Sequence, residues 1–305
     1  MKSFFSSIIG FVSSLFYSLR PLNLFLILLT QTLTCVFLLD NLLCISNLFS
    51  KLDFIAKNCI DFYFLVLATV LSAAGGYILN DIFDRKIDLI NSPKRGSFTE
   101  KNISFLYLLS SLFFGTALLL GLLVSFKIGI AVLFSCALLI FYAKNSKKIG
   151  ILKPVFVSFL TAFSILLVGF DFFDSFNFIP STVWLFSVWA FLLSMLREVI
   201  KDFEDLEGDS SQNSLTSVVQ LGKKNSLWLL YFLSVLLISS LFLAFFISTN
   251  SISTSLHKLI MIALIGIFIF LLNKNHSTSS KKQYKKLSLF CKLMMLVGIL
   301  GMCFY

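Results

Sequence analysis

The chain has 305 residues, of which 58% are hydrophobic and only 13% charged, and its mean hydropathy is +0.94. Soluble domains hold about 45–50% apolar and about 25% charged residues, so this composition excludes a sizeable soluble domain and indicates a polytopic membrane protein. The net charge of +10 comes from 25 basic and 15 acidic residues. In a membrane protein such an excess is typical of cytoplasmic loops, so no nucleic-acid partner is expected.

Residues 1–20 precede the first long apolar stretch and combine Lys2 and Arg20 with an apolar run between them. A signal peptide is the alternative interpretation, but no small-residue cleavage site follows the run. We therefore expect an amphipathic helix whose apolar face rests on the membrane surface.

Nine apolar stretches then follow, each bounded by charged or turn-forming residues and each a candidate membrane-spanning helix. They lie approximately at residues 21–39, 62–79, 103–124, 128–142, 155–170, 182–196, 227–247, 259–272 and 287–304. The divider between the third and fourth is thin, so eight spans is the alternative count. The predicted fold class is all-α, with about nine transmembrane helices over residues 21–305 in two bundle halves around a central cavity open to the cytoplasm.

The basic residues predict the orientation of the chain. With the N-terminus in the cytoplasm, twenty of the 25 fall on the cytoplasmic side. Four are assigned outside, and one, Lys292, lies within the last span; the four are Lys51, Lys57, Lys127 and Lys258. The positive-inside rule thus predicts a protein of the cell's inner membrane with a cytoplasmic N-terminus and an outer C-terminus.

Cysteine and histidine offer little catalytic material. The six cysteines form no CxxC pair and mostly lie in apolar runs, so we interpret them as small buried hydrophobic residues. His257 and His276 are the only histidines, which disfavours imidazole metal sites and Ser-His-Asp catalysis. A metal here should be a hard ion held by carboxylates.

Eight of the 15 acidic residues fall in two short segments, NDIFDRKID at 80–88 and KDFEDLEGD at 201–209. Both contain the pattern DxxDxxxD, and each follows an apolar span and enters a loop assigned to the cytoplasm. The equal spacing indicates an internal duplication. The alternative is that each segment is merely a solvated, charged helix end.

Residues at i, i+3 and i+7 share one helical face, so each span should extend beyond the membrane with a stripe of three carboxylates. Two facing stripes would repel one another unless cations lie between them, and oxygen ligands select Mg²⁺ bridged to substrate phosphates. Nearby basic residues would neutralise such a diphosphate. They are Lys94, Arg95, Lys144, Lys147, Lys148, Arg197 and Lys201.

The first segment resembles the NDxxDxxxD signature of the UbiA superfamily of intramembrane prenyltransferases, and the second resembles the second aspartate motif of that superfamily. Smaller similarities are the N-x-P-x-R loop at 91–95, Tyr142 followed by Lys147, and the RPLN entry to the first span at 20–23. Two departures are Gly96, where the family usually has Pro, and SSQNSL at 210–215, where it usually has a Gly and a basic residue.

The resemblance implies Mg²⁺-dependent transfer of a prenyl group from an isoprenyl diphosphate to a lipid or aromatic acceptor, through an allylic cation shielded from water. It implies that both aspartate triplets bind the diphosphate through Mg²⁺, that Asn80 completes the first metal site, and that four further side chains contact the diphosphate. The triplets are Asp81, Asp84 and Asp88, and Asp202, Asp205 and Asp209, and the four contacting residues are Arg95, Tyr142, Lys147 and Lys201.

The amino-acid sequence of residues 75–95 is most similar to that of the branch that transfers geranylgeranyl to geranylgeranylglyceryl phosphate. A quinone-precursor prenyltransferase is the rival within the superfamily. Two other classes stay open: an ion-coupled transporter, which also pairs acidic residues in two halves, and a degenerate relative that binds prenyl diphosphate without turnover.

Overall fold

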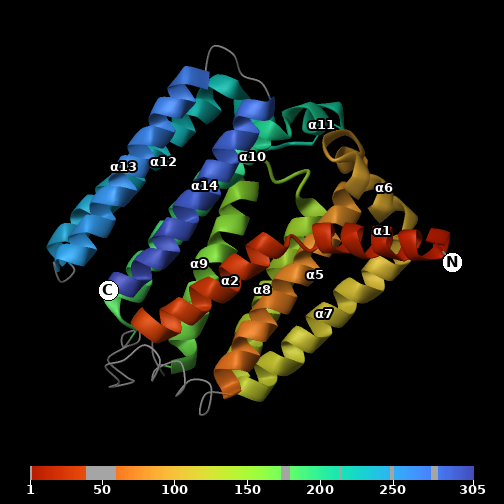
Figure 1. Cartoon of the computed structure of the whole chain (residues 1–305), viewed down its shortest axis with the longest axis horizontal. Helices are drawn as coiled ribbons and strands as arrows, with labels where there is room; N and C mark the ends of the chain where they lie inside the picture. Colours follow the sequence, from red (N-terminus) through yellow and green to blue (C-terminus); the bar gives the residue numbers. More distant parts are fainter. Residues whose placement is uncertain (1, 39–59, 173–178, 213, 248–250, 276–280) are drawn as a thin grey trace. The chain divides into compact units, whose positions relative to one another are not determined.

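The computed structural model describes the chain except residues 1, 39–59, 173–178, 213, 248–250 and 276–280. The described residues form helices, and their one β-type pairing is an isolated parallel bridge between Gly150 and Thr216 (Figure 1). The all-α prediction is therefore confirmed. The predictions for Cys44, Cys59, Lys51 and Lys57 fall outside the described residues, and the described cysteines are free thiols.

The longer helices match the apolar stretches of the sequence, and shorter ones lie between them. The elements are α1 (Lys2–Ser18), α2 (Pro21–Leu33), η1 (Thr34–Leu38, a π-helix), α5 (Ile60–Asn91), α6 (Pro93–Lys101), α7 (Ile103–Val124), α8 (Phe126–Asn145), α9 (Leu152–Phe172), α10 (Ser181–Glu204), α11 (Leu206–Ser211), α12 (Ser217–Ile247), α13 (Ile252–Asn275), α14 (Lys281–Gly301) and η3 (Met302–Phe304).

Eight of the described helices are long and apolar enough to span a membrane, and a bent pair, Gly10–Ser18 with Pro21–Phe37, would make nine. The thin divider between α7 and α8 is a true break. Ser125 has extended backbone angles there, and its hydroxyl accepts a hydrogen bond from the Ile128 amide at 3.1 Å, which caps the start of α8. The two stretches are therefore separate helices.

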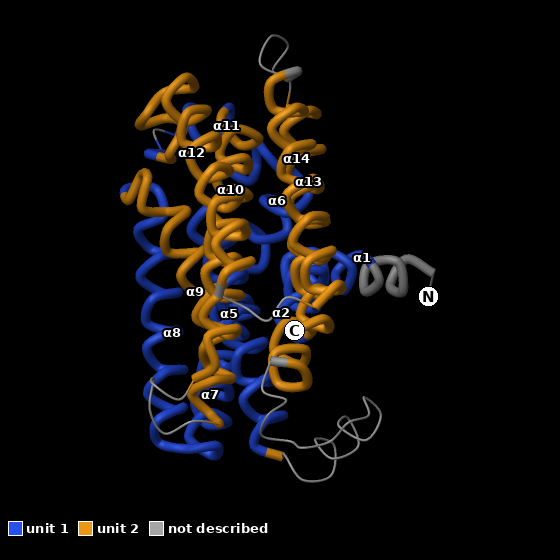
Figure 2. The backbone as a smooth tube through the Cα atoms, turned by 90° about the vertical axis from the view of Figure 1, so that its left-hand side faces the viewer, with its two compact units in different colours: residues 1–28, 61–148, 207–215 blue, residues 29–60, 149–206, 216–305 orange. Residues whose placement is uncertain are grey.

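The chain divides into two compact units (Figure 2). Unit 1 comprises residues 1–28, 61–148 and 207–215, and unit 2 comprises residues 29–60, 149–206 and 216–305. Each unit thus draws on separated parts of the sequence. The predicted central cavity between two halves stays a prediction.

In unit 1, α1 packs against α6. Phe11, Leu15 and Leu19 contact a buried cluster that comes from α5, α6 and α7, and the Phe11 and Phe98 rings meet edge to face at 5.4 Å. The helix predicted over residues 1–20 is confirmed over 2–18, and part of its apolar face lies on protein. Its placement at the membrane surface stays a prediction.

Small residues on α5 allow close helix packing within the same unit. A Cβ added at Gly76 would lie 2.7 Å from Leu139 of α8, and the Ser110 hydroxyl of α7 donates to the Gly75 carbonyl at 2.9 Å. Close approach of this kind is typical of membrane helix interfaces. It fixes α5, the helix that carries the first aspartate motif, against its neighbours.

In unit 2, α10 packs against α9, α12 and α14. Lys258, assigned outside by charge counting, lies in α13 and is fully buried, and its Nζ donates to the Ala244 carbonyl in the last turn of α12 at 2.9 Å. A lysine that binds the carbonyl end of the preceding helix stabilises that helix terminus.

One prediction about the second aspartate motif is wrong. The first motif lies on a continuous helix, α5. The helix that carries the start of the second motif, α10, ends at Glu204, and Asp205 is its C-cap residue, with φ −94° and ψ 2°. Residues 206–211 form a separate short helix, α11, whose Gly208 packs so closely on Asn91 that an added Cβ would lie 2.5 Å from its Nδ2. The three carboxylates of this motif therefore do not form one helical stripe.

Candidate active site

The first aspartate motif occupies the last three turns of α5. Asp81 and Asp88 are buried, with Asp81 only 1% exposed, and Asp84 is partly exposed. A buried carboxylate is costly unless cations or hydrogen-bond donors surround it. Unit 1 supplies both kinds of partner.

Arg20 is the first of these partners. It lies between α1 and α2 with a left-handed φ of 53°, its Nη2 lies 2.8 Å from Asp81 Oδ1, and its guanidinium lies 4.8 Å from the centre of the Tyr77 ring. The residue before Pro21 is disfavoured in helical conformation, so the chain bends here. The bend directs the side chain toward the motif.

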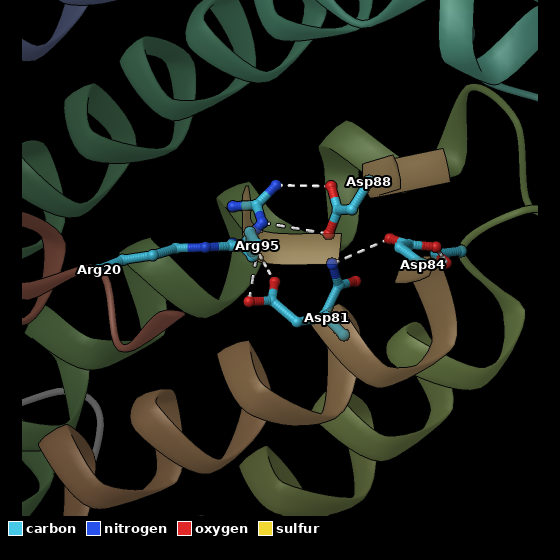
Figure 3. Close-up of polar contacts among 7 residues, drawn as sticks. Arg20, Asp81, Asp84, Asp88 and Arg95 are labelled. Atoms are coloured by element: carbon cyan, nitrogen blue, oxygen red, sulfur yellow. Dashed lines mark hydrogen bonds and ion pairs between the residues drawn. The ribbon is translucent and has the colours of Figure 1, made fainter. Parts of the chain in front are cut away.

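Arg95, on α6, binds Asp88 with two nitrogens. Nη2 lies 2.6 Å from Oδ1, Nε lies 3.1 Å from Oδ2, and Nε also lies 3.8 Å from Asp81 Oδ2. Figure 3 shows Asp81 and Asp88 turned toward this guanidinium, with Asp84 to one side. Burial lowers the pKa of Arg95, but attraction to Asp81 and Asp88 outweighs it, so its pKa lies above the ordinary value.

Gly96 brings α6 close enough for this contact. A Cβ at this position would lie 2.5 Å from the Leu89 amide nitrogen and 2.8 Å from the Asp88 carbonyl carbon, both backbone atoms of α5. A side chain at residue 96 would therefore force α6 away from the end of α5. The close packing at Gly96 holds α6, and with it Arg95, beside the motif.

Asp84 is held by neutral donors. Asn80 Nδ2 donates to it at 2.9 Å and the Ser146 hydroxyl at 3.3 Å. Lys147, expected to contact diphosphate, donates instead to the Phe83 carbonyl at 2.7 Å. The structure therefore brings the loop after α8 to the first motif.

The remaining predicted residues lie in different places. Tyr142 is half-buried near the end of α8, in unit 1, and Asp209 is buried on α11 in the same unit. Lys201, Asp202 and Asp205 belong to unit 2. The Asp202 carboxylate accepts a hydrogen bond from Lys153 Nζ at 2.8 Å, and two more from the backbone amide and the hydroxyl of Ser217.

The oxygen atoms of the first motif suit a magnesium ion in part. Among the described residues, no group of three or more His, Cys, Asp or Glu side chains is gathered as a metal cage. Mg²⁺, however, is usually bound by one or two carboxylates together with substrate phosphates and water. Asn80 Oδ1 and Asp81 Oδ2 are buried oxygens that accept no hydrogen bond from the described residues, so they fit such a partial site.

Sequence reasoning missed two cations as partners of the aspartates. In the sequence, Arg20 is notable only as part of the RPLN entry to the first span. Lys153 is only one of the twenty basic residues assigned to the cytoplasmic side. A basic residue directly before Pro21 at a predicted helix boundary is a usable signal for Arg20. No local pattern links Lys153 to Asp202, which lies 49 residues away.

Residues 56–293 match the model of the UbiA prenyltransferase family, so the chain belongs to that family and is an integral membrane protein. Curated relatives make the similarity more specific. The digeranylgeranylglyceryl phosphate synthase of Saccharolobus solfataricus is 34% identical over 223 residues, which are 73% of this chain and 78% of the relative. The protein of the same name from Methanosarcina mazei is 32% identical over 243 residues, 76% and 80% of the two chains.

Solved structures share the fold. One, described as giving insight into digeranylgeranylglyceryl phosphate synthase in membranes, is 22% identical with a TM-score of 0.68 and covers 97% of this chain and 99% of its own. A UbiA homolog from Archaeoglobus fulgidus bound to GPP and Mg²⁺ is 16% identical with a TM-score of 0.64, and covers 95% and 99%. At these identities the likeness establishes the fold.

Proposed function

We propose that this protein transfers a geranylgeranyl group from geranylgeranyl diphosphate to geranylgeranylglyceryl phosphate. The observation that carries the proposal is the first motif, where buried carboxylates lie with two arginines in one unit. A site that binds diphosphate needs carboxylates to bind the metal ion and guanidinium groups to bind the phosphates. The name of the curated relatives supports the choice of acceptor.

Mg²⁺ would neutralise the diphosphate and so make it a better leaving group. Both oxygens of Asp88 bind Arg95, so Asp88 is proposed to orient that guanidinium rather than to ligate the ion. The residues of the first motif proposed to hold the ion are Asn80, Asp81 and Asp84. In the second motif the same role is proposed for two carboxylates, Asp205 and Asp209. Hard oxygen ligands of this kind suit this ion.

The protein's own cations would stabilise the charge that develops as the reaction proceeds. An acceptor hydroxyl oxygen forms a bond to the allylic carbon, the carbon–oxygen bond to diphosphate breaks, and the hydroxyl proton is released. Arg95 and Arg20, already beside the carboxylates, would hold the departing diphosphate, with Lys147, Lys201 and Tyr142 as further contacts.

The orientation in the membrane is also part of the proposal. The positive-inside rule supports a cytoplasmic N-terminus and a cytoplasmic active site, since the first motif contains Arg85 and Lys86 and is followed by Lys94 and Arg95. Both proposed substrates carry phosphate groups and hydrocarbon tails. A site at the end of a membrane helix can accept both parts.

The test incubates purified protein in nanodiscs with geranylgeranyl diphosphate and Mg²⁺, and with either geranylgeranylglyceryl phosphate or 4-hydroxybenzoate. Diphosphate release and lipid product are measured for wild type, Asp84→Asn and Asp61→Asn. Asp61 is a matched control because it is an exposed carboxylate at the other end of α5. We expect product with the glyceryl phosphate only, lost in Asp84→Asn and retained in Asp61→Asn.

Each other outcome decides against part of the proposal. Product with 4-hydroxybenzoate alone would assign the protein to quinone-precursor prenylation. Absence of diphosphate release with either acceptor, in protein whose unfolding is cooperative, would overturn prenyl transfer and favour a degenerate binder. Membership of a prenyltransferase family gives no support to the transporter alternative.

A further inference from the structure

We infer that Asp202 is a positioning residue that closes the loop bearing the other acidic residues of the second motif, and that it is not a metal ligand. The inference rests on the proposed function, because Asp205 and Asp209 are proposed there as ligands. It divides the three aspartates of this motif into one structural and two functional groups.

The first observation is that both carboxylate oxygens of Asp202 are already bound within unit 2. Lys153 Nζ lies 2.8 Å from Oδ1, and Oδ2 accepts from the Ser217 amide at 3.1 Å and from its hydroxyl at 2.8 Å. The side chain is 1% exposed. An ion ligated here would have to displace a buried cation and two donors.

The second observation is where those donors lie. Lys153 is in the first turn of α9 and Ser217 is the first residue of α12, so Asp202 joins the ends of three helices. Its acceptance from the Ser217 amide satisfies a backbone donor at the start of α12. A carboxylate is also favoured at the positive end of a helix dipole.

The third observation is that Asp202 and Ser217 bracket residues 203–216, which contain Asp205 and Asp209. The contact fixes both ends of that loop at one point. Neighbouring bonds reinforce the closure: Ser226 Oγ donates to the Ser217 carbonyl at 3.3 Å, and the Ile151 amide donates to Gln220 Oε1 at 3.0 Å. Opening the contact would release the segment that presents Asp205.

The test compares Asp202→Asn, Lys153→Met, the double variant and Asp205→Asn, each as full-length protein in nanodiscs. Two quantities are measured without acceptor: the melting temperature, and the affinity for Mn²⁺ in the presence of inorganic diphosphate. Asp202→Asn leaves Lys153 buried without its partner, so we expect a melting temperature lower by about 5–8 °C and Mn²⁺ affinity weakened severalfold.

The double variant decides between the two roles. If Asp202 acts by closing the loop, removing the buried charge of Lys153 as well should recover at least half of both losses, since the amide introduced by Asp202→Asn still offers an oxygen to Ser217. Asp205→Asn should lose Mn²⁺ affinity with little change in melting temperature. Mn²⁺ affinity that stays lost in the double variant while its melting temperature recovers would overturn the inference.

Ser217→Ala provides a milder perturbation that keeps the charged pair. It removes one of the three bonds to Asp202, and we expect Mn²⁺ affinity about two- to threefold weaker. Unchanged or tighter binding, as expected if the freed oxygen served the ion, would contradict the loop role. Wild-type protein that binds no Mn²⁺ with diphosphate would count against the proposed function, whereas the melting-temperature coupling between Lys153 and Asp202 would still test the contact.

Discussion

The pairing of Arg20 with Asp81 predicts the effect of replacing Arg20 with methionine. Methionine keeps a similar stem and has a Cβ like arginine, so the unusual φ at this position costs the same in both proteins. The change leaves a carboxylate that is 1% exposed with its second cation, Arg95, 3.8 Å away. The resulting loss therefore reports on the ion pair.

Removing one partner of a buried pair costs about 3–5 kcal/mol. Because Arg95 still faces Asp81 and Arg20 is 20% exposed, we expect a loss at or just below the lower end of that range, about 2–3 kcal/mol. The lost contact with the Tyr77 ring is included in that figure. For a chain of this size the change corresponds to a melting temperature lower by about 3–5 °C.

The assay is thermal unfolding in nanodiscs without added metal, with Lys101→Met as the control because Lys101 is an exposed cation at the end of α6. Asp81→Asn and the double variant complete a cycle, and the double variant should lose less than the sum of the two single variants. An Arg20→Met melting temperature within about 1 °C of the control, or strictly additive losses, would refute the reasoning.

Three further predictions concern the same unit. Arg95→Lys keeps the charge but cannot make the two-nitrogen contact with Asp88, so prenyl diphosphate turnover should fall about tenfold, as measured by diphosphate release. Gly96→Ala should displace α6 from Leu89 and lower both melting temperature and turnover, whereas Gly115→Ala, which meets open space, should change neither. Chelation of Mg²⁺ with EDTA should stop product formation while the helical circular dichroism signal persists, because the helices are held by packing and hydrogen bonds rather than by the ion; loss of that signal would contradict this assignment.

The helices could be predicted from sequence because a membrane span is a local property. Each apolar stretch carries its own signal in about 20 residues, and the Ser125 break was visible as a thin divider. The first carboxylate stripe was predictable for the same reason, since α5 continues unbroken through Asp88. Periodicity within one segment was sufficient in these cases.

The second motif shows where local periodicity fails. Its spacing equals that of the first, yet the helix stops at Glu204 because residues distant in sequence determine the path of the chain. Asp202 is held by Lys153 and Ser217, and Gly208 packs on Asn91. These contacts depend on tertiary structure, so identical spacing gave two different arrangements.

The SSQNSL segment at 210–215 lacks the basic residue expected after the second motif. That absence is the feature that favours a catalytically degenerate protein. The end of the segment, however, is fixed by backbone bonds, from the Ser214 amide to the Asp209 carbonyl and from the Leu215 amide to the Lys147 carbonyl, at 2.9 and 2.8 Å. Those bonds require no particular side chain. Since Arg20 and Arg95 already place two guanidinium groups at the first motif, the missing cation removes one contact to diphosphate and not the means of neutralising it, so the loop's sequence is compatible with turnover.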